Sequence, residues 1–130
     1  MRSTSYFRKW LAYRKGMLLA KELTELSDTW PKQEKYKLVD QVVRSSRSVC
    51  SNLGESYGKR QYPKHFIAKL SDAASENCET QVWLDFALLF KFITREKYDE
   101  LIAKSEEVGK LLSYMLKYPD QFRTYGGTKK

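Results

Sequence analysis

The sequence is poor in residues that break helices, cross-link chains or bind metals. Its 130 residues include six glycines, three prolines, two cysteines and one histidine. Because glycine and proline mark most turns, so few of them favour long uninterrupted helices over many short strands. Cys50 and Cys78 have neither the spacing of a zinc site nor histidines nearby, so we expect two buried, reduced thiols.

A long hydrophobic run is also missing. The longest apolar stretch, residues 82–93, is broken by Asp85 and Lys91 and falls short of a bilayer-spanning helix. Near the N-terminus, basic residues at positions 8, 9, 14 and 15 interrupt every candidate for the apolar core of a secretory signal. We therefore expect no membrane span and a cytoplasmic location.

Composition and periodicity predict an all-α protein. Hydrophobic residues make up 42% and charged residues 31%, the balance of a globular chain, and the length suits one domain. Apolar residues recur every three or four positions in four segments, residues 6–27, 31–57, 63–89 and 94–118. Short connections predict an antiparallel up-and-down four-helix bundle over residues 1–120, followed by a basic, disordered tail over residues 121–130.

Each predicted helix has recognisable boundaries and an apolar face. Pro31 and Pro63 suit first turns, Gly58 suits a left-handed helix end, Thr94 suits an N-cap, and Pro119 stops the last helix. The face of the first helix is predicted to be Phe7, Trp10, Leu11, Met17, Leu18, Leu23 and Leu26. The second half of the third helix is apolar almost all the way round, which predicts a subunit interface in a cyclic oligomer.

The sequence offers no recognisable catalytic, metal or cofactor site. His65 is the only histidine, and neither a serine nor a cysteine has the local context of a nucleophile. Glu76 and Glu79 have the spacing of a di-iron motif without its histidine, and glycine-rich phosphate loops are missing. We predict a non-enzymatic protein without a metal or a cofactor.

A line of polar residues runs beside the apolar face of the second helix. Arg44 on this line is placed to meet a carboxylate of the third helix in a forked ion pair. We expect a structural polar network that fixes helix register, formed by Gln41, Ser48, Asn52, Glu55, Glu76 and Glu79. The alternative is an unrecognised active site built from Gln41, Arg44, Asn52, Glu55 and Glu79.

Positive charge is concentrated in the first half of the chain. The net charge is +8, and residues 1–60 hold 13 Lys and Arg against 6 Asp and Glu. Such a field attracts polyanions, although a charge excess also serves solubility. The predicted nucleic-acid ligands are Arg44, Arg47, Lys59, Arg60 and Lys64, with Tyr57 and Tyr62 interleaved for stacking on bases. The alternative function is a scaffold that docks an acidic or polymerase-type protein and does not itself bind nucleic acid.

The second and third helices carry a resemblance to a known family. The pattern of the second helix comprises Trp30-Pro31-Lys32-Gln33-Glu34, Tyr36, Leu38, Gln41, Arg44-Ser45, Ser48, Asn52, Glu55 and Gly58-Lys59-Arg60. The third helix continues it with Phe66, Leu70, Ala73, Glu76, Glu79-Thr80-Gln81 and Trp83-Leu84. The chain resembles the four-helix bundle family of 23S rRNA intervening-sequence proteins. Arg47 departs from the pattern, because an apolar residue is common there.

That family is similar to the accessory proteins of diversity-generating retroelements. Those proteins form basic homopentameric barrels that associate with a reverse transcriptase and nucleic acid. The resemblance therefore implies a homopentamer, with RNA or DNA and a reverse transcriptase as the partners to expect.

Overall fold

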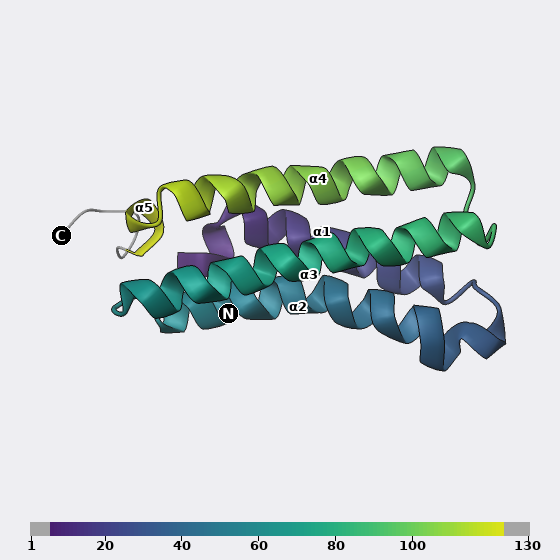
Figure 1. Ribbon diagram of the computed structural model, residues 1–130, viewed down its shortest axis with the longest axis horizontal. Coiled ribbons are helices and arrows are strands. Elements are labelled where there is room, and N and C mark those ends of the chain that lie inside the picture. Colours follow the sequence, from purple (N-terminus) through teal and green to yellow (C-terminus); the bar gives the residue numbers. More distant parts are fainter. Residues whose placement is uncertain (1–5, 124–130) are drawn as a thin grey trace.

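Four long helices lie side by side along the long axis of the molecule (Figure 1). The computed structural model describes residues 6–123. The long helices are α1 (Leu11–Ser27), α2 (Asp40–Gly58), α3 (Pro63–Leu89) and α4 (Arg95–Lys117). Shorter elements are η1 (Tyr6–Lys9), η2 (Lys32–Glu34), η3 (Lys35–Val39) and α5 (Asp120–Arg123). Residues 6–123 contain no strand, which confirms the prediction of an all-α fold.

Local chemistry sets several helix ends as predicted. Pro63 occupies the first turn of α3, and the Thr94 hydroxyl oxygen accepts the backbone N–H of Lys97 at 3.1 Å, capping α4. The prediction of a left-handed Gly58 is wrong. Gly58 remains in α2, and the Lys59 N–H closes the helix on the Glu55 and Ser56 carbonyl oxygens. Among the non-glycine residues of positions 6–123, Lys91 has a left-handed backbone conformation (φ 63°), and it lies between α3 and α4.

The first two predicted helices are each interrupted. Trp10 has an extended backbone (ψ 132°) that separates η1 from α1. Its indole is buried against rings of other elements, and reaching that position requires the chain to bend there. Residues 32–39 form the 3₁₀ turn η2 and the π-helical turn η3 before α2 begins. The Glu34 carboxylate accepts the Leu38 N–H at 3.4 Å in this wider turn.

The predicted apolar face of the first helix is wrong at three of its seven residues. Trp10 and Leu23 are buried as predicted, and Phe7 and Leu26 are partly buried against the core clusters. Leu11, Met17 and Leu18 are exposed, Leu18 by 68%. The buried residues of α1 are Ala12, Gly16, Leu19, Ala20, Leu23 and Ser27, most of which are small. A Cβ atom at Gly16 would lie 3.0 Å from the Cys50 Sγ, so α1 approaches α2 too closely for a large side chain. Close packing against α2 therefore selects the small residues.

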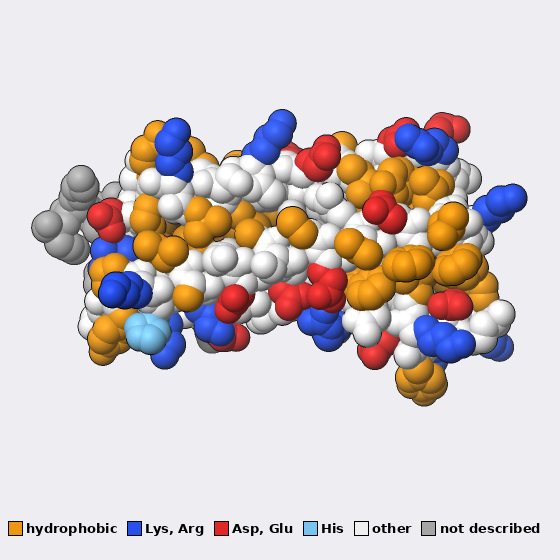
Figure 2. Space-filling view, in the orientation of Figure 1, with side chains coloured by type: hydrophobic (Ala, Val, Ile, Leu, Met, Phe, Trp, Pro, Cys, Tyr) orange, Lys and Arg blue, Asp and Glu red, His pale blue; other side chains and the backbone are white. Residues whose placement is uncertain are grey.

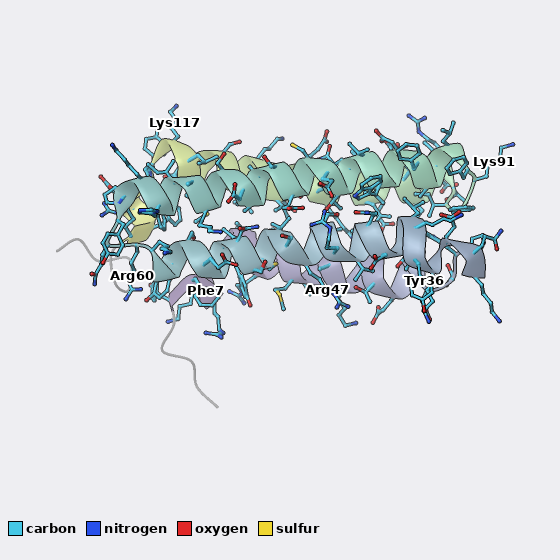
Figure 3. The ribbon with its side chains drawn as sticks, turned by 60° about the horizontal axis from the view of Figure 1, so that its bottom comes forward. Phe7, Tyr36, Arg47, Arg60, Lys91 and Lys117 are labelled. Carbon is cyan, nitrogen blue, oxygen red and sulfur yellow. The ribbon has the colours of Figure 1, made fainter. Side chains whose placement is uncertain are left out.

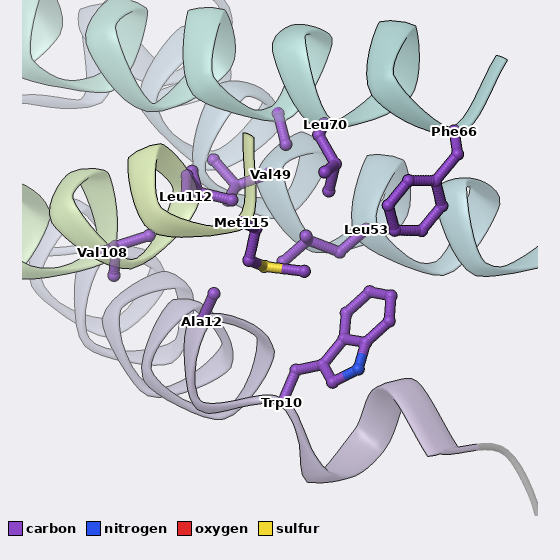
Figure 4. Packing of buried hydrophobic residues seen from close by; sticks show 10 residues of the cluster. Trp10, Ala12, Val49, Leu53, Phe66, Leu70, Val108, Leu112 and Met115 are labelled. Atoms are coloured by element: carbon purple, nitrogen blue, oxygen red, sulfur yellow. The ribbon is translucent and has the colours of Figure 1, made fainter. Parts of the chain in front are cut away.

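The core has two apolar clusters. One surrounds Trp10, Phe66 and Met115 (Figure 4), and the other surrounds Leu23, Trp30 and Leu84. Each long helix contributes residues to both clusters, and the buried residues between these two stretches of the helix are small or polar. They are Gly16, Ser45, Ser46, Asn77, Thr80 and Ser105. The Ser45 and Thr80 hydroxyls are hydrogen bonded at 2.8 Å. This polar layer links α2 to α3 and, through Asn77 and Ser105, α3 to α4.

The second half of α3 keeps exposed apolar side chains, as its all-round apolar pattern predicts. They are Val82, Phe86 and Leu89, and Phe90 follows the helix end. Figure 2 shows these apolar side chains gathered over one end of α3. None of the helices described is both long and apolar enough to cross a membrane.

Two sequence predictions concern residues at the edge of the described structure or on its surface. The predicted tail, residues 121–130, begins inside α5, and residues 124–130 lie outside the described residues. The prediction of two buried thiols is half wrong, because Cys50 is buried but Cys78 is exposed. Asn77 takes the buried position on that turn of α3, and Cys78 therefore faces outward.

Candidate nucleic-acid interface

The five predicted nucleic-acid ligands fall into two separate groups. Arg44 and Arg47 lie in the middle of α2, whereas Lys59, Arg60 and Lys64 surround the connection between α2 and α3. Twelve residues of helix separate Arg47 from Lys59, a distance of about 18 Å along the axis. Figure 3 shows Arg47 near the middle of the molecule and Arg60 at one end. The structure therefore does not bring all five into one patch.

Arg44 forms the predicted fork with two carboxylates of α3. Its Nη1 lies 3.3 Å from the Glu76 Oε1, and its Nη2 contacts the Glu79 Oε1. The Trp83 indole N–H donates to the same Glu79 oxygen at 3.3 Å. Two partly buried carboxylates offset the positive charge of Arg44, so less of it is available to a phosphate group. The fork joins α2 to α3.

The other members of the predicted polar network make local contacts. The Asn52 amide nitrogen donates to the Ser48 carbonyl oxygen at 2.9 Å on its own helix. Glu55 forms an ion pair with Lys69 of α3 at 2.8 Å. Gln41 is exposed and lines a shallow apolar groove beside Trp83. These side chains do not converge on a shared pocket, which disfavours the active site considered from the sequence.

The sequence reasoning missed the buried polar contacts at the centre of the molecule. The Gln81 amide nitrogen donates to the Ser105 hydroxyl oxygen at 2.9 Å, and Asn77 bonds the same serine. The signal was present, because Ser45, Asn77 and Ser105 interrupt otherwise apolar helix faces at heptad-like positions. Small polar residues within an apolar stripe are typical of such layers.

Arg47 lines a groove between α1 and α2. Its Nη2 donates to the Thr24 hydroxyl oxygen of α1 at 3.3 Å. The groove has a volume of about 620 Å³ between α1 and α2 and is lined mainly by apolar side chains, with Lys21 and Glu25 at its border. Arg47 therefore faces the α1 side of the molecule, away from the carboxylates that hold Arg44.

Lys59, Arg60, Tyr62 and Lys64 form what we call the α2–α3 corner. Lys59 and Lys64 are exposed. The Arg60 guanidinium lies over the Tyr57 ring, 4.0 Å from its centroid, and its Nη1 donates to the Tyr57 carbonyl oxygen at 2.9 Å. Tyr62 is 58% exposed, with its ring edge-on to His65. Phosphate contacts and base stacking are both available here.

The two thiols differ in exposure, since Cys50 is buried and Cys78 is exposed. Burial raises the pKa of the Cys50 thiol to about 11, so this residue stays protonated at neutral pH. The Gly16 backbone covers it closely from α1.

Within residues 6–123, no cluster of three or more His, Cys, Asp or Glu side chains is placed to hold a metal ion.

A family model and a solved structure match this chain. The model described as "23S rRNA-intervening sequence protein" matches residues 8–114. Among curated proteins, none matches this chain. A crystal structure from Bacteroides thetaiotaomicron, described as a protein with unknown function from the S23 ribosomal protein family, is 30% identical with a TM-score of 0.75. That match covers 82% of this chain and 96% of the other. The chain belongs to the family of 23S rRNA-intervening sequence proteins.

Proposed function

We propose that this protein is a non-enzymatic, oligomeric module that binds the sugar–phosphate backbone of RNA or DNA. The observation that carries the proposal is the α2–α3 corner. There, Lys59 and Lys64 are exposed and have no carboxylate partner within residues 6–123. Exposed cations of this kind bind phosphates irrespective of base sequence, and their binding weakens as salt rises.

The proposal includes an antiparallel up-and-down arrangement of the four helices. Contacts between α2 and α3 support it, because rising numbers on α2 meet falling numbers on α3. Arg44 and Ser45, near the start of α2, meet Glu79 and Thr80, whereas Glu55, near the end of α2, meets Lys69, which comes earlier in α3. This order is that of two neighbouring helices joined by a short turn.

The oligomer would form through the outward face of α3. Exposed residues without charge follow one another there at spacings of three and four: Ala68, Ser71, Ser75, Cys78, Val82, Phe86 and Leu89. Leu89 is 69% exposed, and a row of stacked rings joins Trp83, Phe86 and Phe90 at centroid distances of 5.9 and 6.0 Å. An uncharged stripe along a whole helix suits another copy of the chain.

The resemblance noted from the sequence refines this proposal. It gives five as the number of subunits and a reverse transcriptase as the protein that the module would assist. A cytoplasmic location of the protein is part of the same proposal.

A binding titration tests the nucleic-acid function. Labelled RNA and DNA are titrated with the protein at low and moderate salt. We expect binding at low salt that weakens steeply with salt, and the slope should fall by about 1 for each phosphate-binding lysine that is removed. The variant Lys59→Glu/Lys64→Glu should abolish most of the binding.

A matched control separates this site from overall charge. The variant Lys32→Glu/Lys35→Glu makes the same change in net charge at exposed positions at the other end of α2. If both variants lose affinity equally, the corner is not the site. If the unmodified protein ignores nucleic acid at low salt but retains an acidic or polymerase-type protein, the scaffold function replaces the proposed one.

A further inference from the structure

Cations from four separate segments meet at one end of the molecule. They come from η1, the α2–α3 corner, the last turn of α4, and α5: Arg8, Lys9, Lys59, Arg60, Lys64, Lys117 and Arg123. We call this set the basic end. Figure 3 places Phe7, Arg60 and Lys117 toward this end, and Tyr36 and Lys91 toward the opposite end. The Arg123 Nε donates to the Arg60 carbonyl oxygen at 2.8 Å, which ties α5 to the corner.

Most of these cations lie against aromatic rings. The Arg8 guanidinium is 4.7 Å from the Phe7 ring centroid, and the Lys9 Nζ is 5.1 Å from that of Tyr6. The Lys117 Nζ lies 5.5 Å from the Tyr118 ring centroid. Arg123 instead pairs with Asp120 at 2.7 Å, and Lys59 and Lys64 are exposed.

In the middle of the molecule, by contrast, cations pair with carboxylates. There, the Lys104 Nζ lies 2.7 Å from a Glu22 carboxylate oxygen. A carboxylate cancels the charge of its partner, whereas an aromatic ring attracts a cation without neutralising it. At the basic end, Lys59 and Lys64 are exposed and have no carboxylate partner within residues 6–123, so this end keeps a positive field that attracts a polyanion.

A cluster of buried and partly buried rings supports the basic end. The Trp10 ring contacts those of Tyr57, Phe66 and Phe122, with centroids 5.9, 6.3 and 6.0 Å apart. These rings belong to α2, α3 and α5, and Figure 4 shows Trp10 and Phe66 among the packed side chains. The Phe122 ring also contacts that of Tyr114 in α4 at 6.1 Å, so these rings join the segments that carry the cations.

Tyr62 supplies a flat, accessible ring beside these charges. It is 58% exposed, and the His65 ring meets it edge-on at 6.1 Å and 89°. The Tyr62 N–H donates to the Lys59 carbonyl oxygen at 2.8 Å, which fixes the connection on which the ring stands. An exposed aromatic ring among cations can stack on a base.

We infer that the basic end is a binding site for single-stranded nucleic acid. An unpaired base would stack on Tyr62, and the neighbouring phosphates would lie against Lys9, Lys59 and Lys64. A duplex keeps its bases stacked on one another, so it offers phosphates but no base face to Tyr62. This inference rests on the proposed function and specifies its ligand.

Binding of matched oligonucleotides tests it. A labelled single strand and the duplex of the same length are titrated with the full chain at one salt concentration. We expect Tyr62→Ala to weaken single-strand binding by about 5- to 100-fold, the range for loss of one base–aromatic stack, and to leave duplex binding unchanged. Tyr62→Phe keeps the ring and should keep the affinity.

Tyr36→Ala is the control, because Tyr36 is 82% exposed and lies 5.4 Å from the Lys35 Nζ at the opposite end. It should leave single-strand binding unchanged. Circular dichroism and light scattering verify that each variant keeps its helices and subunit number. The inference is overturned, but the proposed function is not, if binding depends on salt and Tyr62→Ala leaves it unchanged. The same holds if Tyr62→Ala weakens the binding of single strand and duplex equally. No binding of either oligonucleotide at low salt overturns both.

Discussion

Asn77 and Ser105 exchange two hydrogen bonds between α3 and α4. The Asn77 amide nitrogen donates to the Ser105 carbonyl oxygen at 2.9 Å, and the Ser105 hydroxyl donates to the Asn77 amide oxygen at 3.0 Å. Both side chains are buried in the polar layer between the apolar clusters. A shift of α4 by one turn along α3 would bury these groups without partners, so the pair specifies the register of the two helices.

We expect Asn77→Ala to lower the free energy of unfolding by about 1–3 kcal/mol, because the buried Ser105 hydroxyl loses its acceptor. Chemical denaturation followed by circular dichroism measures this. Ser75→Ala, at an exposed position of the same helix, should change stability by less than about 0.5 kcal/mol. A double-mutant cycle measures the coupling between Asn77 and Ser105. If Asn77→Ala lowers the free energy of unfolding equally in the unmodified protein and in Ser105→Ala, the two residues are not coupled.

Gly16 tests the close approach of α1 and α2. We expect Gly16→Leu to destabilise the fold by about 1–3 kcal/mol or more, since its Cβ alone would lie 3.0 Å from the Cys50 Sγ. Gly58→Leu is the matched control, because nothing lies within 4 Å of a Cβ at that position. Thermal unfolding of both variants gives the comparison, and equal melting temperatures would refute the packing argument.

The raised pKa of Cys50 predicts a loss of stability at high pH. The folded chain binds the thiol proton more tightly than the unfolded chain, whose thiol has a pKa of 9.0, against about 11 when folded. The protonated thiol therefore stabilises the folded chain fully below pH 9. As the pH rises to 11, this contribution is lost and the free energy of unfolding falls by up to about 3 kcal/mol. Urea denaturation at pH 8 and 11 measures the change, and Cys50→Ala should show a smaller loss. An identical loss in both proteins would remove Cys50 as its cause.

A charge on the α3 stripe should disrupt assembly. We expect Val82→Glu to reduce the subunit number without changing helix content, because the new carboxylate would be buried without a partner in the interface. Ser113→Glu adds the same charge at an exposed position of α4 and should not alter assembly. Light scattering gives the mass of each. Thiol labelling adds a second measurement, since Cys78 should react faster in Val82→Glu than in the unmodified oligomer.

Much of the fold follows from local sequence patterns. Proline at position 63 and threonine at position 94 start helices as predicted, because these signals act within one turn. The α1 face was mispredicted in part because Leu11, Met17 and Leu18 were taken as core, whereas the close approach of α1 to α2 at Gly16 leaves no room for a large side chain there. The candidate site was predicted in part. The Arg44 fork follows from residue types, but the split of the basic residues into two groups depends on where α2 ends.

The sequence alone determined that this chain is helical, that its first half is basic, and that one helix carries more apolar surface than its neighbours can cover. These properties follow from residue type and spacing along one chain segment. Only the tertiary structure decided which carboxylates hold Arg44, which side of α1 is buried, and which cations share the basic end with Tyr62. These contacts join residues from different helices, and the fit of side chains between helices selects them.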